Sequence, residues 1–201
     1  MWQIILAAGW PIWPLIIASV VAVAIIIERS FVLRDNSVAP KNLLPELQTW
    51  LAKGGVTKDT IDRLERHSLL GQLFATALAN AKHSREITKE SIEETARAVA
   101  HKLERYLSTL GTIATVAPLL GLLGTVIGMV ELFGAFTNTG HDVAQFARGI
   151  SVALYNTAAG IVVAVPAMIA YRFFRTKVDT LLLEMEQQAI KLVEILHGER
   201  N

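Results

Sequence analysis

The sequence predicts an all-α membrane protein with three transmembrane helices. Apolar residues make up 52% of its 201 residues, and the mean hydropathy is +0.42. Three stretches contain no Asp, Glu, Lys or Arg: 1–27, 110–130 and 149–171. Each is long enough for a helix to cross the ~30 Å hydrocarbon core of a bilayer. Three spans leave room for one modest region outside the membrane, and not for a separate catalytic domain.

The rest of the composition excludes several kinds of chemistry. The chain has no cysteine, which excludes disulfides, Cys-ligated zinc and thiol nucleophiles. The five histidines lack metal-ligand spacing, and no glycine-rich phosphate loop follows a predicted strand. The net charge of +1 does not favour a polyanionic partner such as a nucleic acid. We therefore expect no cofactor, no metal and no enzymatic activity.

The first apolar stretch divides near its prolines. Trp2, Trp10 and Trp13 crowd its first half, and tryptophan prefers the membrane interface. We therefore expect an interfacial lead-in over residues 1–13 and the core of the first transmembrane helix over 14–27. A cleaved signal peptide is the alternative, but a basic leading segment is missing.

The lysines and arginines predict the orientation of the spans. Basic residues flank one end of each span: Arg29, Arg34, Lys102, Arg105, Arg172, Arg175 and Lys177. Only Arg148 lies between the second and third spans. Positive residues accumulate on the cytoplasmic side of membrane proteins. We therefore expect a periplasmic N-terminus, a periplasmic loop between the second and third spans, and a cytoplasmic C-terminus.

Apolar periodicity extends the second and third spans far into the cytoplasm. Apolar residues recur every three or four positions from Ile92 to Leu110 and from Val178 to Leu196. We expect one uninterrupted helix over 88–136 and another over 149–197, each about 73 Å long at 1.5 Å per residue. The two form an antiparallel hairpin joined by a loop over 137–148, and residues 198–201 are a tail.

Residues 28–87 are expected to form a cytoplasmic helical region. Pro40, Pro45 and the pair Gly54-Gly55 interrupt it. A short amphipathic helix is expected over 43–52, and a second helical stretch from Thr57 toward His83. This region is expected to pack on the long helices.

Small residues mark a packing face on each long span. Helices in lipid gain little from ordinary hydrophobicity, so glycines indicate where two backbones approach closely. On the second span this face comprises Gly121, Gly124, Thr125 and Gly128. On the third span it comprises Ala153, Thr157, Gly160 and Ala164. We expect these faces to pack against each other or against a helix from another protein.

Two prolines and two threonines are expected at matched depths. Pairing the predicted helices from their periplasmic ends places Pro118 level with Pro166 and Thr125 level with Thr157. Each proline frees a carbonyl four residues earlier, so kinks at one level indicate a hinge plane or a hydrated constriction. The alternative for the threonines is that each hydroxyl bonds to the carbonyl four residues earlier in its own helix.

Two segments carry a distinctive pattern. They are Ala117-Pro-Leu-Leu-Gly-Leu-Leu-Gly-Thr-Val-Ile-Gly-Met129 and Gly149-Ile-Ser-Val-Ala-Leu-Tyr-Asn-Thr-Ala-Ala-Gly-Ile-Val-Val-Ala-Val-Pro-Ala167. They resemble the two signature spans of the MotA/TolQ/ExbB proton-channel family, and the order of spans fits that family across the whole chain. Three spans instead of four resemble its ExbB and TolQ branch more than its flagellar MotA branch.

The resemblance implies a homo-oligomer, a pentamer of this subunit, around two helices of an ExbD- or TolR-like single-span partner. An aspartate of that partner would carry protons through the bacterial inner membrane and drive force on a TonB- or TolA-like protein. By position, Thr125 and Thr157 match the family's pore threonines, which can hydrogen-bond the partner's carboxyl or a water wire beside it. The sequence departs from the pattern at Val152, where some ExbB members place a glutamate.

Glu131 is the remaining carboxylate in the apolar part of the chain. It lies near the outer end of the second predicted span, at nearly the depth of Val152. Ionisable groups inside membranes commonly belong to ion pathways, so we hypothesise that Glu131 collects protons in place of the acidic group absent at Val152. The alternative is that Glu131 lies at headgroup level, extended to water or paired with Arg148.

Three functions fit these observations. The first is a channel and stator subunit that, with an ExbD-like partner, uses the proton-motive force to energise TonB-dependent transport across the outer membrane. The second is a TolQ-like subunit of the Tol-Pal envelope system. The third, from a different class, is a passive scaffold for a partner's helices, against which the internal polar face argues. The sequence does not distinguish protons from sodium ions.

Overall fold

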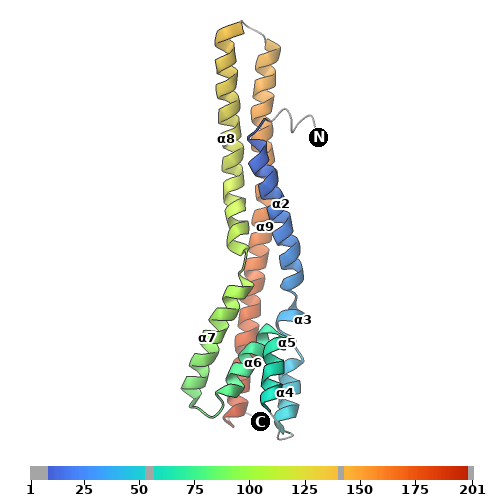
Figure 1. Cartoon of the computed structure of the whole chain (residues 1–201), viewed down its shortest axis with the longest axis vertical. Coiled ribbons are helices and arrows are strands. Elements are labelled where there is room, and N and C mark those ends of the chain that lie inside the picture. Colours follow the sequence, from blue (N-terminus) through green and yellow to red (C-terminus); the bar gives the residue numbers. More distant parts are fainter. Residues whose placement is uncertain (1–8, 53–56, 140–142, 199–201) are drawn as a thin grey trace. The chain divides into compact units, whose positions relative to one another are not determined.

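The computed structural model describes residues 9–52, 57–139 and 143–198, and the regular elements of these residues are helices (Figure 1). They are α2 (Ile12–Val32), α3 (Asp35–Val38), α4 (Leu43–Ala52), α5 (Lys58–His67), α6 (Leu69–Ala79), α7 (Arg85–Leu103), α8 (Leu107–Thr139) and α9 (Val143–Leu196). The chain forms two compact units. The first comprises residues 1–28 and 106–173, and the second comprises 29–105 and 174–201.

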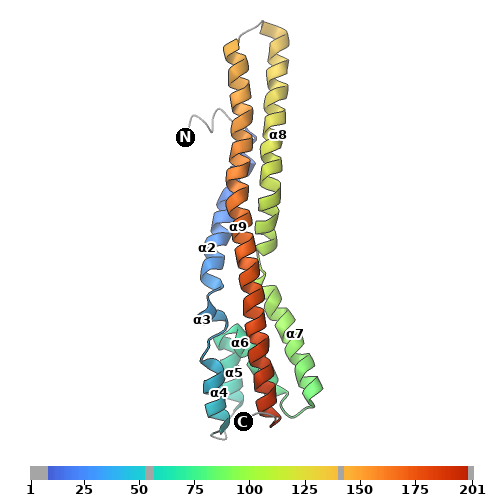
Figure 2. The ribbon, with the colours of Figure 1, turned by 180° about the vertical axis from the view of Figure 1, so that it is seen from behind.

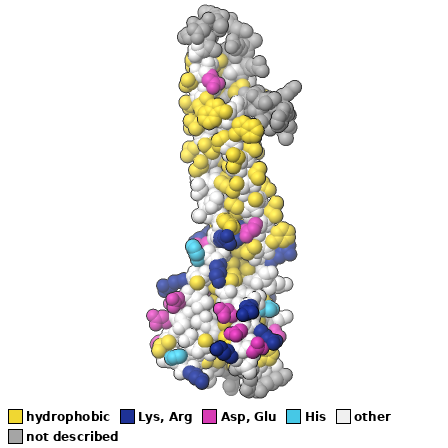
Figure 3. Space-filling model, viewed as in Figure 1, with side chains coloured by type: hydrophobic (Ala, Val, Ile, Leu, Met, Phe, Trp, Pro, Cys, Tyr) yellow, Lys and Arg dark blue, Asp and Glu magenta, His cyan; other side chains and the backbone are white. Residues whose placement is uncertain are grey.

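Three described segments are long and apolar enough to cross a membrane: Ile12–Val32, Leu107–Gly134 and Gly149–Leu196. In the most apolar window of each, only 22% to 28% of the residues are buried within the chain. Hydrophobic side chains accordingly gather on the surface of the first unit and charged ones on that of the second (Figure 3). The predicted all-α fold with three candidate spans is confirmed. Residues 1–8 of the expected interfacial lead-in lie outside the described residues.

The cytoplasmic extension predicted for the second span is not continuous with it. In place of one helix over 88–136, the structure has α7 and α8, separated by a turn at residues 104–106. Within this turn Tyr106 has a φ of 62°, in the left-handed region that residues with a side chain seldom adopt. No glycine or proline marks the turn in the sequence, and the apolar periodicity continues through it. The turn was therefore not predicted.

A buried arginine lies at the end of α7. Arg29 of α2 is 2% exposed, and its Nη1 donates a hydrogen bond to the carbonyl oxygen of Leu103 at 3.1 Å. Leu103 is the last residue of α7, where helix carbonyls have no partner inside the helix. The next residue, Glu104, forms a 2.8 Å ion pair with Arg175 of α9. Residues distant in the sequence therefore stabilise this helix end.

The third long helix begins earlier than predicted. It was expected over 149–197, and α9 runs from Val143 to Leu196. Since α8 continues to Thr139, most of the loop expected over 137–148 is helical, and its residues 140–142 lie outside the described part of the chain.

The stretch predicted from Thr57 toward His83 is a pair of helices, α5 and α6, that meet at Ser68. The Ser68 hydroxyl accepts a hydrogen bond from the backbone N–H of Gly71 at 3.0 Å and so caps α6. A Cβ at Gly71 would collide with the carbonyl oxygen of Leu64 in α5. This corner therefore requires glycine at position 71.

We predict that Arg29→Ala lowers the free energy of unfolding by about 1–3 kcal/mol, because the buried Leu103 carbonyl loses its donor. Circular dichroism of the detergent-purified protein during chemical unfolding measures this change. Arg34→Ala is the matched control, since Arg34 is exposed and stacks over Phe31 with 4.9 Å from Cζ to the ring centroid. Equal losses in the two variants would contradict the role assigned to Arg29.

Candidate functional site: the face between α8 and α9

The helices α8 and α9 approach each other through glycines. A Cβ added to Gly121 would lie 2.8 Å from the carbonyl oxygen of Asn156 and 3.1 Å from Cα of Thr157. A Cβ added to Gly160 would lie 2.7 Å from the carbonyl oxygen of Ala117. Real Cβ atoms essentially never come within 3.0 Å of another heavy atom, so the backbones leave no room for a larger residue at either glycine. Such close packing supplies the van der Waals contact that holds helices together in lipid.

Asn156 is a polar residue of this face that the sequence analysis did not single out. Its side chain is 1% exposed, and its Nδ2 donates a hydrogen bond to the carbonyl oxygen of Val152 at 3.3 Å. A Cβ at Gly124 would lie 2.6 Å from the Cβ of Asn156, so this glycine makes space for the amide. One feature of the sequence could have identified Asn156: it is an amide side chain four residues before Gly160, in a span without charged residues.

The remaining small residues fit less tightly. A Cβ at Gly128 would lie 3.5 Å from the Cβ of Ala153, an ordinary van der Waals distance. Ala164 is buried in a hydrophobic cluster with Ala117 and with Leu15 of α2. Three partly buried residues pack against this cluster: Leu120, Ala159 and Val163. The cluster fixes α2 to the pair of long helices.

The two threonines share the flank of this pair that lies away from α2. Leu120 of α8 and Ala159 of α9 pack against the cluster that contains Leu15 of α2. Thr125 follows Leu120 by five residues and Thr157 precedes Ala159 by two, which at ~100° per residue turns each threonine about 140–160° away. Because Gly124 faces Asn156, the two threonines that follow them lie within about 3 Å of the same depth. Figure 2 shows the helix pair from behind, with α9 passing in front of α2.

Both threonines are partly exposed. The Oγ1 of Thr125 donates to the carbonyl oxygen of Leu122 at 2.7 Å, which is the bond within its own helix that the simpler alternative anticipated, made three residues back instead of four. A hydroxyl that donates in this way still has lone pairs on its oxygen. Thr125 can therefore accept a hydrogen bond from water or from a protonated carboxyl of another helix.

The prolines do not lie level with each other. Pro118 and Pro166 both lie inside helices. The contact between Gly121 and Gly160 sets the register, and it places Pro166 about one helical turn deeper toward the second unit's end of α9 than Pro118 lies on α8. The expected common plane of two kinks is therefore wrong in its register.

Glu131 does not lie beside Thr125 and Thr157. Its side chain is exposed, and six residues at ~100° each place it about 120° around α8 from Thr125. It also lies about 31 Å along the helix from Leu110, which is the full thickness of the hydrocarbon core. This position fits the alternative in which Glu131 lies at the level of the lipid headgroups. The side chain of Arg148, its suggested partner, is not among the described side chains. Among the residues that the structure describes, no group of His, Asp and Glu is arranged to hold a metal ion.

The chain is similar to proteins of a known family. The model of a family described as the MotA/TolQ/ExbB proton channel family matches residues 65–187, which include the whole face between α8 and α9. The chain is 30% identical over 183 residues to biopolymer transport protein exbB1 of Vibrio cholerae serotype O1, covering 89% of this chain and 80% of that protein. It is 29% identical over 202 residues to Tol-Pal system protein TolQ of Haemophilus influenzae, covering 91% of this chain and 86% of that protein. Similarity of this degree to both proteins does not separate the two systems.

We predict that Gly160→Ala lowers the free energy of unfolding by about 1–3 kcal/mol, because the added methyl group has no space against Ala117. Gly134→Ala is the matched control in the same pair of helices, since a Cβ there has no neighbour within 4 Å. Unfolding in mixed detergent micelles, followed by circular dichroism, compares the two variants. If Gly160→Ala were as stable as Gly134→Ala, the backbones would not meet as described.

Proposed function

Because this chain belongs to the MotA/TolQ/ExbB proton channel family, we propose that it is the channel and stator subunit of a motor in the bacterial inner membrane. The family is one of membrane channels and not of enzymes. In this proposal the subunit forms a homopentamer around an ExbD-like single-span partner that carries a membrane aspartate. The assembly uses the proton-motive force to energise a TonB-like protein, and through it transport across the outer membrane.

The shared flank of Thr125 and Thr157 is the observation that carries the proposal. Two hydroxyls at one depth, on the side of the helix pair away from α2, offer hydrogen-bond acceptors where a carboxyl of another helix would otherwise be stranded in lipid. The side of α2 that faces away from the pair is mostly apolar, with Ile17 at 63% and Val20 at 64% exposure. We therefore infer that α2 faces the lipid and that the threonine flank faces the partner.

The inferred orientation follows the distribution of basic residues. Arg34, Arg105 and Arg172 are exposed beside the ends of the apolar segments, so they remain available to the cytoplasmic surface. Arg29 differs, since it is buried and bonded to Leu103. The proposed topology, with a periplasmic N-terminus and a cytoplasmic C-terminus, rests on the exposed residues.

A TolQ-like role in the Tol-Pal system is the second candidate, favoured by the 29% identity to TolQ of Haemophilus influenzae over most of both chains. The geometry of the threonine flank suits an ExbD-like and a TolR-like carboxyl equally. Purification of the native complex and identification of its single-span partner separate the two roles. A partner bound to a TonB-like protein supports the first role, and one bound to a TolA-like protein supports the second.

We predict that Thr157→Val leaves assembly with the partner intact and lowers proton flux by about 5- to 30-fold, the effect of losing one hydrogen bond of roughly 1–2 kcal/mol on the path. Flux is measured with a pH-sensitive dye in vesicles that contain the copurified complex. Thr180→Val is the control, because the Thr180 hydroxyl is exposed and bonds to Thr176 at 2.9 Å beyond the basic residues that end the span. Normal flux in Thr157→Val would identify the chain as a passive scaffold.

We further predict that Glu131→Gln lowers proton flux by up to about tenfold, because an exposed carboxylate at the outer mouth raises the local concentration of cations. The same vesicle assay measures the effect, and raising the salt concentration should shrink it. Glu184→Gln, an exposed carboxylate of α9 in the second unit, is the control. Unchanged flux in Glu131→Gln would leave Glu131 as a headgroup-level residue without a part in conduction.

A further inference from the structure

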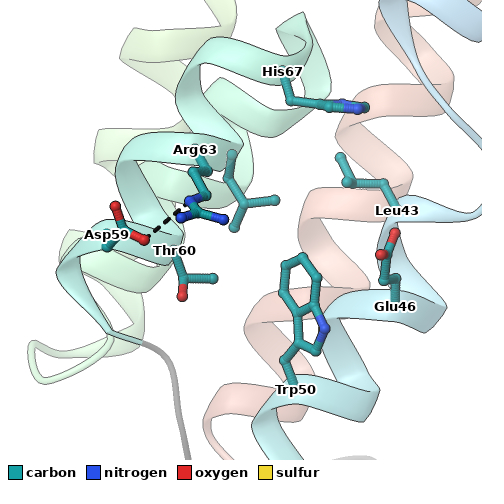
Figure 4. A pocket seen from close by; sticks show the side chains of 8 residues that line it. Leu43, Glu46, Trp50, Asp59, Thr60, Arg63 and His67 are labelled. Carbon is teal, nitrogen blue, oxygen red and sulfur yellow. Dashed lines mark ion pairs between the residues drawn. The ribbon is translucent and has the colours of Figure 1, made fainter.

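A cavity of about 420 Å³ lies between α4 and α5 in the second unit, far along the chain from the α8–α9 face. Each helix turns one stripe of side chains toward it (Figure 4). The stripe of α4 comprises Leu43, Glu46 and Trp50. The stripe of α5 comprises Asp59, Thr60, Arg63, Leu64 and His67. The volume falls within the range of pockets that hold small organic molecules.

The cavity has an apolar floor and a polar rim. Leu43 and Leu64, which are 5% and 3% exposed, form the floor. The indole of Trp50 is partly buried and points into the space between the two helices (Figure 4). The charged side chains stand at the exposed rim, so a ligand can place an apolar stem on the floor and a charged end at the edge.

The charges of the rim do not cancel. Asp59 and Arg63, four residues apart on α5, form an ion pair of 3.0 Å and so neutralise each other. Glu46 forms no ion pair with any described residue, which leaves the rim with an excess of one negative charge when His67 is neutral. Glu46 lies one helical turn before Trp50, so its carboxylate and the indole are presented together.

We propose that this pocket binds an organic cation, an ammonium or guanidinium group carried on an apolar stem. The face of a tryptophan attracts cations more strongly than any other aromatic side chain, and the carboxylate of Glu46 supplies a counter-charge beside it. The same chemistry is presented by a free polyamine and by a lysine or arginine side chain of a peptide. The residues of the pocket differ from those of the proposed proton path, so the proposal stands or falls independently of the motor function.

Tryptophan fluorescence of the full-length protein in detergent tests the proposal. Spermidine and a blocked Gly-Arg-Gly peptide are titrated separately, with glutamate as the anionic control. We expect a saturable change in emission that disappears in Trp50→Phe, which separates Trp50 from the three tryptophans at positions 2, 10 and 13. Saturation by spermidine alone would identify a free polyamine, and saturation by the peptide alone would identify a basic chain.

Two substitutions should move the affinity in opposite directions. Glu46→Gln removes the excess charge and should weaken cation binding about fivefold, whereas Arg63→Gln releases Asp59 and should strengthen it by a similar factor. Glu65→Gln is the matched control, because Glu65 is an exposed carboxylate of α5 that does not line the pocket. Circular dichroism verifies that each variant keeps its helices.

Three outcomes would overturn the proposal. The first is the absence of saturable binding for both cations up to millimolar concentration. The second is equal affinity in Glu46→Gln and Glu65→Gln, which would indicate non-specific attraction to surface charge. The third is weaker binding in Arg63→Gln, which would show that the pocket prefers an anion.

Discussion

The contact between the backbones of α8 and α9 is the constraint on which the membrane part of this protein depends. Gly121 and Gly160 admit no side chain, so the two helices have one register and one distance at that point. The register sets Asn156 opposite Gly124 and brings Ala117 and Ala164 together to receive Leu15 of α2. Because α2 occupies one flank of the pair, Thr125 and Thr157 lie on the other flank. The side proposed to face the partner therefore depends on the register that the glycines set.

The sequence was sufficient for the features that depend on local pattern. Absence of charge over spanning length located the three apolar helices, because bilayer thickness imposes a minimum length whatever the fold. The spacing of small residues identified Gly121 and Gly160 as packing residues. The structure places both where the backbones of α8 and α9 come close together. The part that Thr125 and Thr157 play in conduction remains a prediction, since it depends on a helix from another protein.

The features that the sequence analysis missed depend on contacts between distant residues. The end of α7 is stabilised by Arg29, 74 positions earlier in the chain, so the residues around Leu103 carry no local sign of it. In the sequence, Asn156 is one of several polar residues of the span. Its burial becomes evident only when α8 and α9 are paired. The level of the prolines was misjudged because the predicted helix ends were wrong, and an error at the ends of a hairpin shifts every pair along it.

The interruption at Tyr106 has an electrostatic consequence. A continuous helix would carry its partial charges only at its far tips, whereas the break gives α8 a new N-terminus at the start of its apolar segment. About half an elementary positive charge belongs to such an end. The same break gives α7 a C-terminus at Leu103, which carries a partial charge of the opposite sign, and the buried guanidinium of Arg29 binds the last carbonyl of that end.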